Sequence, residues 1–545
     1  MIGLADLAHP ETRSWTEAES AFVWPAISEY NIAADCLRSN PAKTAVIAID
    51  GDTKKQVTYG ELNERSARFG AGLGRLKVAP GDRVAVKLPQ SIDMAVAVLG
   101  ILRIGAIVVP ISNVLGEDAL VHRLADSAPK VLISSGSRPE VDFARKAGAI
   151  PITTEARDDI QSMEELMAGP QPAGGFLPTR PDTPGLLLYT SGTTGKSKGV
   201  LHGHRVLLGH HATDLALDHV REDDVAYSPV DWAWAGGLLL GLLVPLARGM
   251  TVVAYRGTRL DPERTIEIMR ECGVSVGLFP PTALRMLYRS GKLTPAVAAT
   301  LRLRSLILGA EAVEPELADW ARGELGISVN NAFGQTEANA LIGHSDVLGA
   351  LDRDCLGRAY PGHTIAILDP DLHECAPGVA GEIAVSTTDP VCMLRYWNNP
   401  EATEKKIRGG WLLTGDVGHT DDRHQIYFHG RADDLIKSGG YRIGPAEVEA
   451  AILLNPVVAE CAVIGIPDPV RGQVVTAYAQ LVDGENGSDA LTQALQYQVR
   501  KKVGAHAYPR TVLYVTSLPR TTTGKVDRNA LRKAFSERSE TEAAR

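Results

Sequence analysis

The sequence predicts a large α/β domain built on layered parallel sheets, with a small β-rich subdomain, followed by a smaller α+β domain. Short apolar runs such as Thr44–Ile49 and Ile107–Pro110 alternate with helical segments, a pattern typical of parallel sheets. From about residue 364 the strands come closer together, with Gly turns between them, which indicates the subdomain. Gly430–Pro445 mixes charges with glycines and indicates a boundary. We therefore expect domains at residues 1–430 and 431–545.

Several elements can be predicted individually. Thr58 and Glu61 have the spacing of a capping box, so a helix should begin there and continue to about Leu76. Beyond the boundary, helices are expected at residues 445–454 and 489–503, beside three strand-like runs. The apolar stretch 232–247 contains glycines and a proline and is shorter than the roughly 20 residues that cross a bilayer, so we expect buried core there.

Composition excludes some classes of function. A net charge of −9 disfavours a general nucleic-acid binder. The six cysteines lie far apart without a Cys-x-x-Cys pair, which argues against a zinc knuckle or a disulfide framework and favours a reducing compartment. The first residues lack the apolar core of a signal peptide. We therefore expect a cytoplasmic protein with no membrane span.

A loop rich in Gly, Ser, Thr and Lys follows the buried run Leu186–Tyr189 directly. Its glycines let backbone N–H groups turn inward, its hydroxyls add donors and its lysines add positive charge, as a phosphate site requires. The second half matches a Walker loop, but Thr190 occupies the position of the first Walker glycine. A flexible Gly/Ser loop is the alternative. The residues concerned are Thr190, Ser191, Gly192, Thr193, Thr194, Gly195, Lys196 and Lys198.

Three later segments carry further chemistry. Asn331–Glu337 offers an aromatic ring, a hydroxyl and a carboxylate near a strand, which suit a base, a phosphate and Mg²⁺. Asp416 ends an apolar run and could accept two ribose hydroxyls. Lys525 lies in a second Gly/Thr loop and could offer charge to two anions. Taken alone, Glu337 would more simply be a solvated side chain, Asp416 part of a turn and Lys525 a surface lysine.

Together, in this order over residues 185–530, the segments resemble the signature motifs of the acyl-adenylate-forming superfamily, which includes acyl-CoA synthetases, peptide-synthetase adenylation domains and luciferases. Ser438–Pro445, Pro467–Val475 and Tyr508–Arg510 resemble its medium-chain acyl-CoA synthetase branch, to which acetyl-CoA synthetase is related. The resemblance implies ATP, Mg²⁺ and coenzyme A, and a small domain that rotates about a hinge at Asp433 between two half-reactions. The alternative is that Asp433 only pairs with a nearby arginine.

The resemblance also implies a role for each matching residue. Lys525, Glu337 and Thr336 would be catalytic, with Glu337 the Mg²⁺ ligand. Ser438, Gly439 and Gly440 would line the coenzyme A tunnel, where a side chain at Gly440 would block the passage. Besides the loop residues above, the nucleotide would contact Ala310, Glu311, Ala312, Asn331, Ala332, Phe333, Gly334, Gln335, Asp416, Arg431 and Arg442. Ala310 and Ala312 replace the family's common Gly and Pro.

The acyl pocket is expected to be larger than one for acetate. In the acetate-specific relatives a Trp precedes the Gln-Thr-Glu, and Gly334 stands there in this chain. Ala235 and Gly236 likewise align with a Val and a Thr that line the small pocket. Both differences enlarge the cavity and favour a medium-chain, branched, cyclic or aromatic acid. The alternative is that Trp232 and Trp234 refill the space.

The predicted function is an acyl-CoA synthetase that makes acyl-AMP from a carboxylic acid and ATP and transfers the acyl group to coenzyme A. A ligase with another acceptor and a non-catalytic adenylate-binding protein are the alternatives. The latter would be expected to lack Lys525 or Glu337, and both are present. The Pro519–Lys525 spacing resembles sites of regulatory lysine acetylation, so an acetyltransferase acting on Lys525 is a further hypothesis. Assembly as a homo-oligomer is left open.

Overall fold

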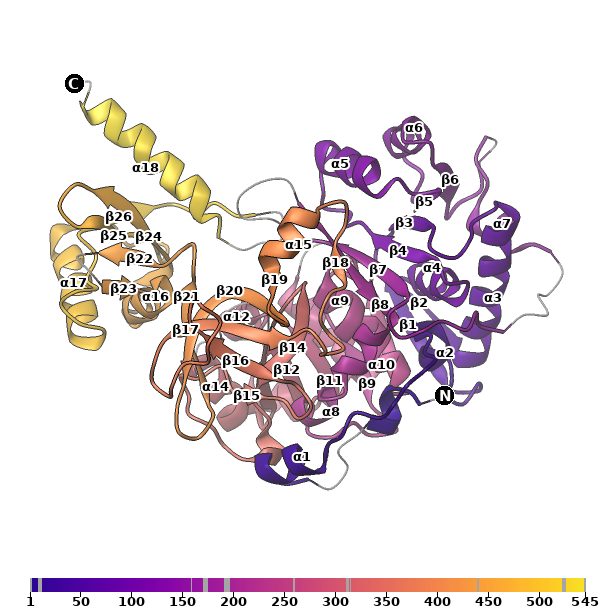
Figure 1. Ribbon diagram of the computed structural model, residues 1–545, viewed down its shortest axis with the longest axis horizontal. Helices are drawn as coiled ribbons and strands as arrows, with labels where there is room; N and C mark the ends of the chain where they lie inside the picture. The colour runs from indigo at the N-terminus through magenta and orange to yellow at the C-terminus, as the bar shows by residue number, and fades with distance from the viewer. Residues whose placement is uncertain are drawn as a thin grey trace. The chain divides into compact units, whose positions relative to one another are not determined.

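The computed structural model describes residues 2–7, 12–157, 159–169, 175–190, 197–257, 260–309, 313, 315–438, 441–521 and 526–543. The chain forms two compact units, each of which is described by itself. The first contains the described residues within 1–190, 198–365 and 385–412, and most of the second lies within 366–384 and 413–545. Figure 1 labels their helices and strands in chain order.

One sheet of the first unit has a parallel centre and antiparallel edges (Figure 1). Across the sheet the strands are β15 (Arg358–Ala359), β14 (Ala338–Gly343), β13 (Ser328–Gln335), β12 (Ser305–Gly309), β11 (Val276–Phe279), β9 (Val225–Tyr227), β10 (Thr251–Tyr255), β1 (Thr44–Asp50) and β2 (Thr53–Thr58). From β13 to β1 every pairing is parallel, whereas β14, β15 and β2 pair antiparallel. The predicted parallel layer is therefore present.

A second sheet of this unit contains the two strands that flank the predicted phosphate loop in sequence. Its strands are, in order, β18 (Arg395–Tyr396), β8 (Gly199–Gly203), β7 (Pro184–Tyr189), β4 (Ile107–Pro110), β3 (Arg83–Lys87), β5 (Val131–Ser134) and β6 (Ile150–Thr153). The pairings from β7 through β6 are parallel, and β8 pairs antiparallel with both β7 and β18. Strand β8 thus lies between two antiparallel neighbours.

Helices connect and cover these strands. They are η1 (Leu4–Leu7), α1 (Trp15–Ala21), α2 (Ile32–Cys36), α3 (Tyr59–Arg75), α4 (Ile92–Arg103), α5 (Glu117–Ser127), α6 (Arg138–Lys146), α7 (Met163–Met167), η2 (His204–His210), α8 (Thr213–Ala216), α9 (Ala235–Leu238), η3 (Leu239–Leu243), α10 (Val244–Ala247), α11 (Pro262–Cys272), α12 (Pro281–Ser290), α13 (Pro295–Ala298), α14 (Pro315–Leu325), η4 (Asp346–Leu348) and α15 (Pro400–Lys406). The short strand β19 (Ile407–Arg408) follows α15.

Helix α3 begins where its capping box predicts. The Glu61 backbone N–H donates to Thr58 Oγ1 at 3.2 Å, and Glu61 Oε2 accepts from the Thr58 backbone N–H at 2.7 Å. These two bonds satisfy donors that the first helical turn leaves unpaired. The apolar face of α3 packs on α4, which is buried at every residue except Asp93. The apolar stretch that predicts α4 therefore forms the centre of the first unit's core.

The apolar stretch 232–247 forms a broken helix, α9, η3 and α10, inside the same core. Pro245 lies just after the π-helical turn of η3, and it has no N–H to donate within this helical run. Within the described residues, no helix combines the length and the apolar character that a membrane span needs. The prediction of buried core is confirmed.

The second unit combines two sheets. In one, β17 (Gly381–Ser386) lies between β16 (Ile365–Leu368) and β20 (Trp411–Thr420), and β20 also pairs with β21 (Ile426–Arg431). In the other, β22 (Ile436–Ser438) lies between β23 (Tyr441–Ile443) and β25 (Gly472–Leu481), and β25 also pairs with β24 (Val458–Asp468) and β26 (Thr511–Val515). Its helices are α16 (Pro445–Leu453), α17 (Asp489–Lys502) and α18 (Arg528–Ala543). Apolar residues of α16 and α17 pack on the second sheet.

Three histidines are buried in and just after β8. Burial lowers the pKa of His202, His204 and His210 to about 4. Protonating an imidazole inside an apolar core costs solvation free energy, and the few polar neighbours of these side chains do not compensate for that cost. These side chains are therefore neutral in the folded protein near pH 7. In the unfolded chain they take up protons near pH 6.5, so acidification from 6.5 toward 4 favours unfolding.

Replacing one of these histidines should flatten the acid limb of the stability curve. The Ile32 backbone N–H donates to His204 Nδ1 at 3.1 Å, and the amide oxygen of an asparagine can accept the same bond. We expect His204→Asn to reduce the slope of unfolding free energy against pH by about 1.4 kcal/mol per pH unit between 6.5 and 4. Urea unfolding at several pH values measures the slope. His373→Asn, at an exposed site, is the control, and equal slopes in both variants would contradict the assignment.

Candidate active site

The two ends of the phosphate loop are fixed by an antiparallel hairpin. Tyr189, at the end of β7, is opposite Gly199, at the start of β8. The Thr190 backbone N–H donates to the Lys198 carbonyl at 3.0 Å. The predicted loop residues Ser191, Gly192, Thr193, Thr194, Gly195 and Lys196 lie outside the described residues. What the structure establishes here is the hairpin from which that loop starts and to which it returns.

The second signature forms a hairpin of its own. Residues Asn331–Gln335 belong to β13, and β14 returns antiparallel after a turn at Thr336 and Glu337. The backbones approach so closely that a Cβ on Gly334 would lie 2.4 Å from the Ala340 backbone nitrogen. The hairpin itself therefore requires glycine at position 334, independently of any substrate. Asn331, Ala332, Phe333 and Gln335 are all partly buried along this strand.

Glu337 is held at both its main chain and its side chain. Its carbonyl accepts from the Met393 backbone N–H at 2.8 Å. Its Oε1 accepts from the Tyr396 hydroxyl at 2.6 Å, within the range of a charge-assisted bond. Tyr396 belongs to β18, which pairs with β8, and the Lys198 ammonium lies 5.1 Å from the centre of its ring. The strand that leaves the phosphate loop is thus joined through Tyr396 to the predicted metal ligand.

Thr336 is fixed by a buried histidine. His202 Nε2 lies 2.7 Å from the Thr336 carbonyl oxygen. A carbonyl only accepts, so Nε2 carries the proton and donates. Nδ1 then has no hydrogen, and no partner for it is found in the described part of the chain. The Asn339 side-chain amide donates to the same carbonyl at 3.4 Å. The turn that carries the predicted hydroxyl and carboxylate is therefore anchored on three sides.

The donor set fits a magnesium ion. No group of three or more His, Cys, Asp or Glu side chains that could hold a metal occurs among the described residues. Glu337 instead supplies one carboxylate, with one oxygen fixed by Tyr396. Mg²⁺ commonly binds through one or two carboxylates together with substrate phosphates and water. Glu337 is thus suited to a magnesium ion that arrives with a nucleotide, rather than to a metal caged by protein.

Asp416 and Arg431, the two predicted ribose contacts, lie side by side in the second unit. They are opposite each other on β20 and β21, and Arg431 Nη1 donates to Asp416 Oδ1 at 3.2 Å. Asp416 is 3% exposed, and Gly415 before it has a φ of +77°, which an L-residue adopts only with strain. The Gly415 backbone N–H donates to Glu382 Oε1 at 2.7 Å. Arg431 Nε also lies 3.4 Å from Asp433 Oδ1, so the predicted hinge residue forms an ion pair.

The predicted acyl-pocket residues differ in exposure. Trp232 is fully buried in the core around α4, and Trp234 is half-buried in a cluster with Tyr189 and Trp397. Ala235 is partly buried against the same core as Trp232. A Cβ on Gly236 would meet only Leu278 Cδ2, at 3.6 Å, an ordinary van der Waals distance. Of the two glycines in the pocket argument, Gly236 has room for a side chain and Gly334 does not.

Asp231 shapes the loop that carries these residues, although the sequence analysis assigned it no role. Its Oδ2 accepts from the Ser112 hydroxyl at 2.5 Å and its Oδ1 from the Ala233 backbone N–H at 3.0 Å. Burial raises the pKa of Asp231. His202 and Tyr396 were also missed. A polar residue between apolar neighbours just after the phosphate loop was the available signal for His202, whereas no local pattern distinguishes Tyr396.

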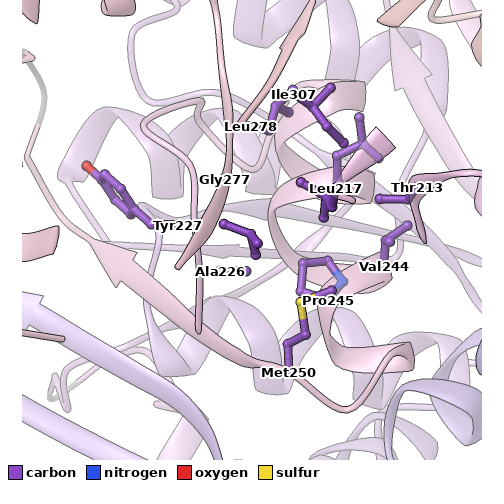
Figure 2. Close-up of a pocket in the computed structure, with 12 residues that line it drawn as sticks. Thr213, Leu217, Ala226, Tyr227, Val244, Pro245, Met250, Gly277, Leu278 and Ile307 are labelled. Carbon is purple, nitrogen blue, oxygen red and sulfur yellow. The ribbon is translucent and has the colours of Figure 1, made fainter. Parts of the chain in front are cut away.

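A small apolar cavity lies beyond Leu278 (Figure 2). Its volume is about 10 Å³, close to what a single water occupies. Gly277, Ala226 and Met250 also line it, and the Tyr227 side chain points away from the other labelled residues in Figure 2. The cavity is too small for an acyl chain.

The remaining predicted residues are only partly described. Ser438 is buried on β22 opposite Tyr441, and the backbone of Arg442 pairs with Lys437. Ala310, Glu311, Ala312, Gly439, Gly440 and Lys525 lie outside the described residues. The nucleotide contacts, the coenzyme A tunnel and the adenylation lysine assigned to them stay predictions.

Residues 34–397 match the model of the AMP-binding enzyme family, and residues 447–525 match its C-terminal domain. The chain belongs to the AMP-binding enzyme family. Acetyl-coenzyme A synthetase of Bacillus subtilis (strain 168) is 31% identical over 95% of this chain and 93% of its own. A Brucella canis acyl-CoA synthetase structure is 30% identical, with a TM-score of 0.73 and coverage of 96% and 99%. A benzoate CoA ligase from Burkholderia xenovorans LB400 is 28% identical, with a TM-score of 0.80 and coverage of 92% and 100%.

These similarities establish the class of reaction. Membership of the AMP-binding family, with acyl- and acetyl-CoA synthetases as relatives along nearly the whole chain, makes the protein an AMP-forming acid–CoA ligase. Its substrates are accordingly a small carboxylic acid, ATP and coenzyme A. The superfamily and branch that the sequence motifs indicated are confirmed, and so is the predicted fold class.

The two pocket glycines should respond differently to a methyl group. Gly334→Ala places Cβ 2.4 Å from a backbone nitrogen, so the hairpin must shift, and overpacking of this kind costs about 1–3 kcal/mol. Gly236→Ala adds a methyl at van der Waals distance inside α9, where alanine is the better helix former. We expect the first variant to lower the melting temperature and the second to leave it unchanged or higher. Equal melting temperatures would contradict the hairpin geometry.

Proposed function

We propose that the protein joins a carboxylic acid larger than acetate to coenzyme A through acyl-AMP, with release of AMP and pyrophosphate. The acid would be medium-chain, branched, cyclic or aromatic. The observation that carries this substrate class is the room at Gly236, where a missing side chain leaves only Leu278 within contact distance. At about 0.8 kcal/mol per buried CH₂, a pocket that accepts several more carbons favours the larger acid by several kcal/mol.

Gly334 adds less to this argument than the sequence suggested. The β13–β14 hairpin already requires glycine at position 334, so this residue is not independent evidence for an open pocket. The names of the relatives do not decide the size of the acid either, because one is an acetyl-coenzyme A synthetase and another is a benzoate CoA ligase. Family membership therefore leaves the size of the acid open, and the proposal rests on the local packing at Gly236.

In the first half-reaction the carboxylate attacks the ATP α-phosphate. Two anions must approach, so the site has to supply positive charge and donors. Lys525 would contact both the carboxylate and the α-phosphate, and the phosphate loop would hold the leaving phosphates. Thr336 would donate its hydroxyl to phosphate oxygen from a turn fixed by His202. Mg²⁺, when bound at Glu337, would withdraw charge from the phosphates.

In the second half-reaction the coenzyme A thiol displaces AMP. Lys525 has to leave the site, which the proposed rotation of residues 431–545 about Asp433 would achieve. Breaking the ion pair between Asp433 and Arg431 would be part of that motion. Ser438, Gly439 and Gly440 would then line the tunnel for the thiol arm, and Arg442 would take part in nucleotide contacts. Acetylation of Lys525 would remove its charge and stop the first half-reaction.

The first test is the acid profile of the purified protein. We expect AMP release with ATP, Mg²⁺ and coenzyme A to peak at about six to ten carbons or at a ring acid, across acetate to decanoate, cyclohexanecarboxylate, benzoate and phenylacetate. Lys525→Ala should lower the rate of acyl-AMP formation by about 10²–10³-fold, since it removes a charge used in the transition state. Chemically made acyl-AMP should still react with coenzyme A in this variant.

The outcomes of this test are distinguishable. A peak at acetate would contradict the proposed substrate class while leaving the reaction intact. Acid-dependent pyrophosphate exchange that does not depend on coenzyme A would contradict coenzyme A as the acceptor. A Lys525→Ala variant with the wild-type rate would contradict the role of that lysine.

A side chain at Gly236 should shift the profile toward shorter acids. Gly236→Thr fills the space in front of Leu278, and losing room for two to three carbons costs about 0.8 kcal/mol each. We expect kcat/KM for the preferred acid to fall by about 10- to 50-fold and the value for acetate or propionate to change little. Gly323→Thr is the matched control, because a Cβ there has no neighbour within 4 Å. A uniform loss for all acids would mean that Gly236 does not line the acyl pocket.

A further inference from the structure

We propose that Tyr396 is a positioning residue for Glu337. Its hydroxyl fixes Oε1 of the carboxylate, so that the group is already oriented when a metal-bound nucleotide arrives. This inference rests on the proposed role of Glu337 as the metal ligand. It adds a residue that the sequence motifs left unassigned, and it predicts a defect in metal use rather than in folding.

The hydrogen bond itself has the length and burial of a rigid contact. The two oxygens are 2.6 Å apart, and Tyr396 is 5% exposed. A short hydrogen bond from a hydroxyl to an ionised carboxylate is stronger than one between neutral groups. Among the described residues no hydrogen bond to Oε2 of Glu337 occurs, so one oxygen is engaged by protein while the other retains its acceptor capacity.

Tyr396 is in turn held at its backbone, and therefore offers a fixed donor. Its main-chain position is set by antiparallel pairing with Val200 on β8. Its backbone N–H donates to the Thr403 hydroxyl at 3.1 Å. Donors that are themselves fixed lose little freedom when they orient a metal ligand.

The side-chain torsions are what remains to be fixed at Glu337. Its own carbonyl and that of Thr336 already accept hydrogen bonds from Met393 and His202. A glutamate with an anchored backbone still has three rotatable bonds between backbone and carboxylate. The bond from Tyr396 restricts those torsions directly, and it comes from the same short segment as Met393.

The ring of Tyr396 also contacts Lys198, the residue just before strand β8. The Lys198 ammonium lies 5.1 Å from its centre, within the range of a cation–π contact. One side chain therefore contacts the last lysine of the loop with its ring and the acidic turn with its hydroxyl. A phenylalanine keeps the first contact and loses the second, which makes Tyr396→Phe selective for the hydrogen bond.

The chain offers a matched control for this substitution. Tyr30 donates to Asp35 Oδ2 at 2.6 Å and is fully buried. It is the same kind of bond at the same length, between residues assigned no part in catalysis. Tyr30→Phe reports what the loss of such a bond does to stability alone.

The experiment uses the full-length protein in four forms: wild type, Tyr396→Phe, Tyr30→Phe and Glu337→Gln. Binding of Mn²⁺·ATP is titrated by the change in water-proton relaxation when Mn²⁺ is held on the protein, with protein-free Mn²⁺·ATP as the reference and without the acid or coenzyme A. The Mg²⁺ concentration for half-maximal AMP release and the melting temperature are measured alongside. For Tyr396→Phe we expect Mn²⁺ affinity to fall and the Mg²⁺ requirement to rise by about 10- to 100-fold, as for other residues that orient metal ligands.

Each outcome supports or overturns the inference. Tyr30→Phe should keep the wild-type metal affinity even if its melting temperature falls. If Tyr396→Phe binds Mn²⁺·ATP like wild type while Glu337→Gln does not, Tyr396 has no positioning role and the proposed role of Glu337 stands. If Glu337→Gln also binds normally, both the inference and the assignment of Glu337 fail. If Tyr396→Phe loses stability but no metal affinity, the inference is overturned as well, because the role of Tyr396 would then be structural.

Discussion

Strand β8 is paired on both sides, and the arrangement of the candidate active site depends on this pairing. Its partner β7 leads into the phosphate loop and β8 itself leads out, so the distance between the ends of that loop is set by a ladder of backbone hydrogen bonds. Its other partner, β18, carries the tyrosine that contacts Glu337. Because backbone hydrogen bonds fix the antiparallel register, Tyr396 is held beside Val200 although the two residues are far apart in sequence.

A buried histidine of this strand is polar without being charged. His202 lies where a protonated imidazole would compete with incoming cations for the acidic turn, and burial keeps it neutral down to about pH 4. A neutral imidazole still donates one directed hydrogen bond, which is what the Thr336 carbonyl receives. Tying the turn down with neutral donors keeps the carboxylate of Glu337 as the local charge on that turn.

The sequence predicts the positions of helices and strands better than it predicts the contacts between distant residues. The capping box at Thr58 and the apolar period of α4 are local signals, so the positions of those helices followed from the chain alone. The residues of the signature motifs also indicated the correct family. The bond between Tyr396 and Glu337 joins strand β18 of one sheet to the β13–β14 hairpin of another, and nothing in either segment encodes the other. Gly334 was explained by what a pocket needs, whereas the packing of a neighbouring backbone decides it.

That backbone contact also limits how substrate preference can change during evolution. A bulky residue at position 334, like the Trp of the acetate-specific relatives, first needs a wider β13–β14 hairpin, and a wider hairpin alone brings no benefit in substrate choice. A bulky residue at position 334 and a wider hairpin are each unfavourable without the other. Descendants of this protein should therefore seldom change the size of their preferred acid through that position. Position 236 is open to single replacements and offers the shorter path. If Gly236 lines the acyl pocket as proposed, lineages that diverge in substrate would therefore differ first within α9 and only later in the hairpin.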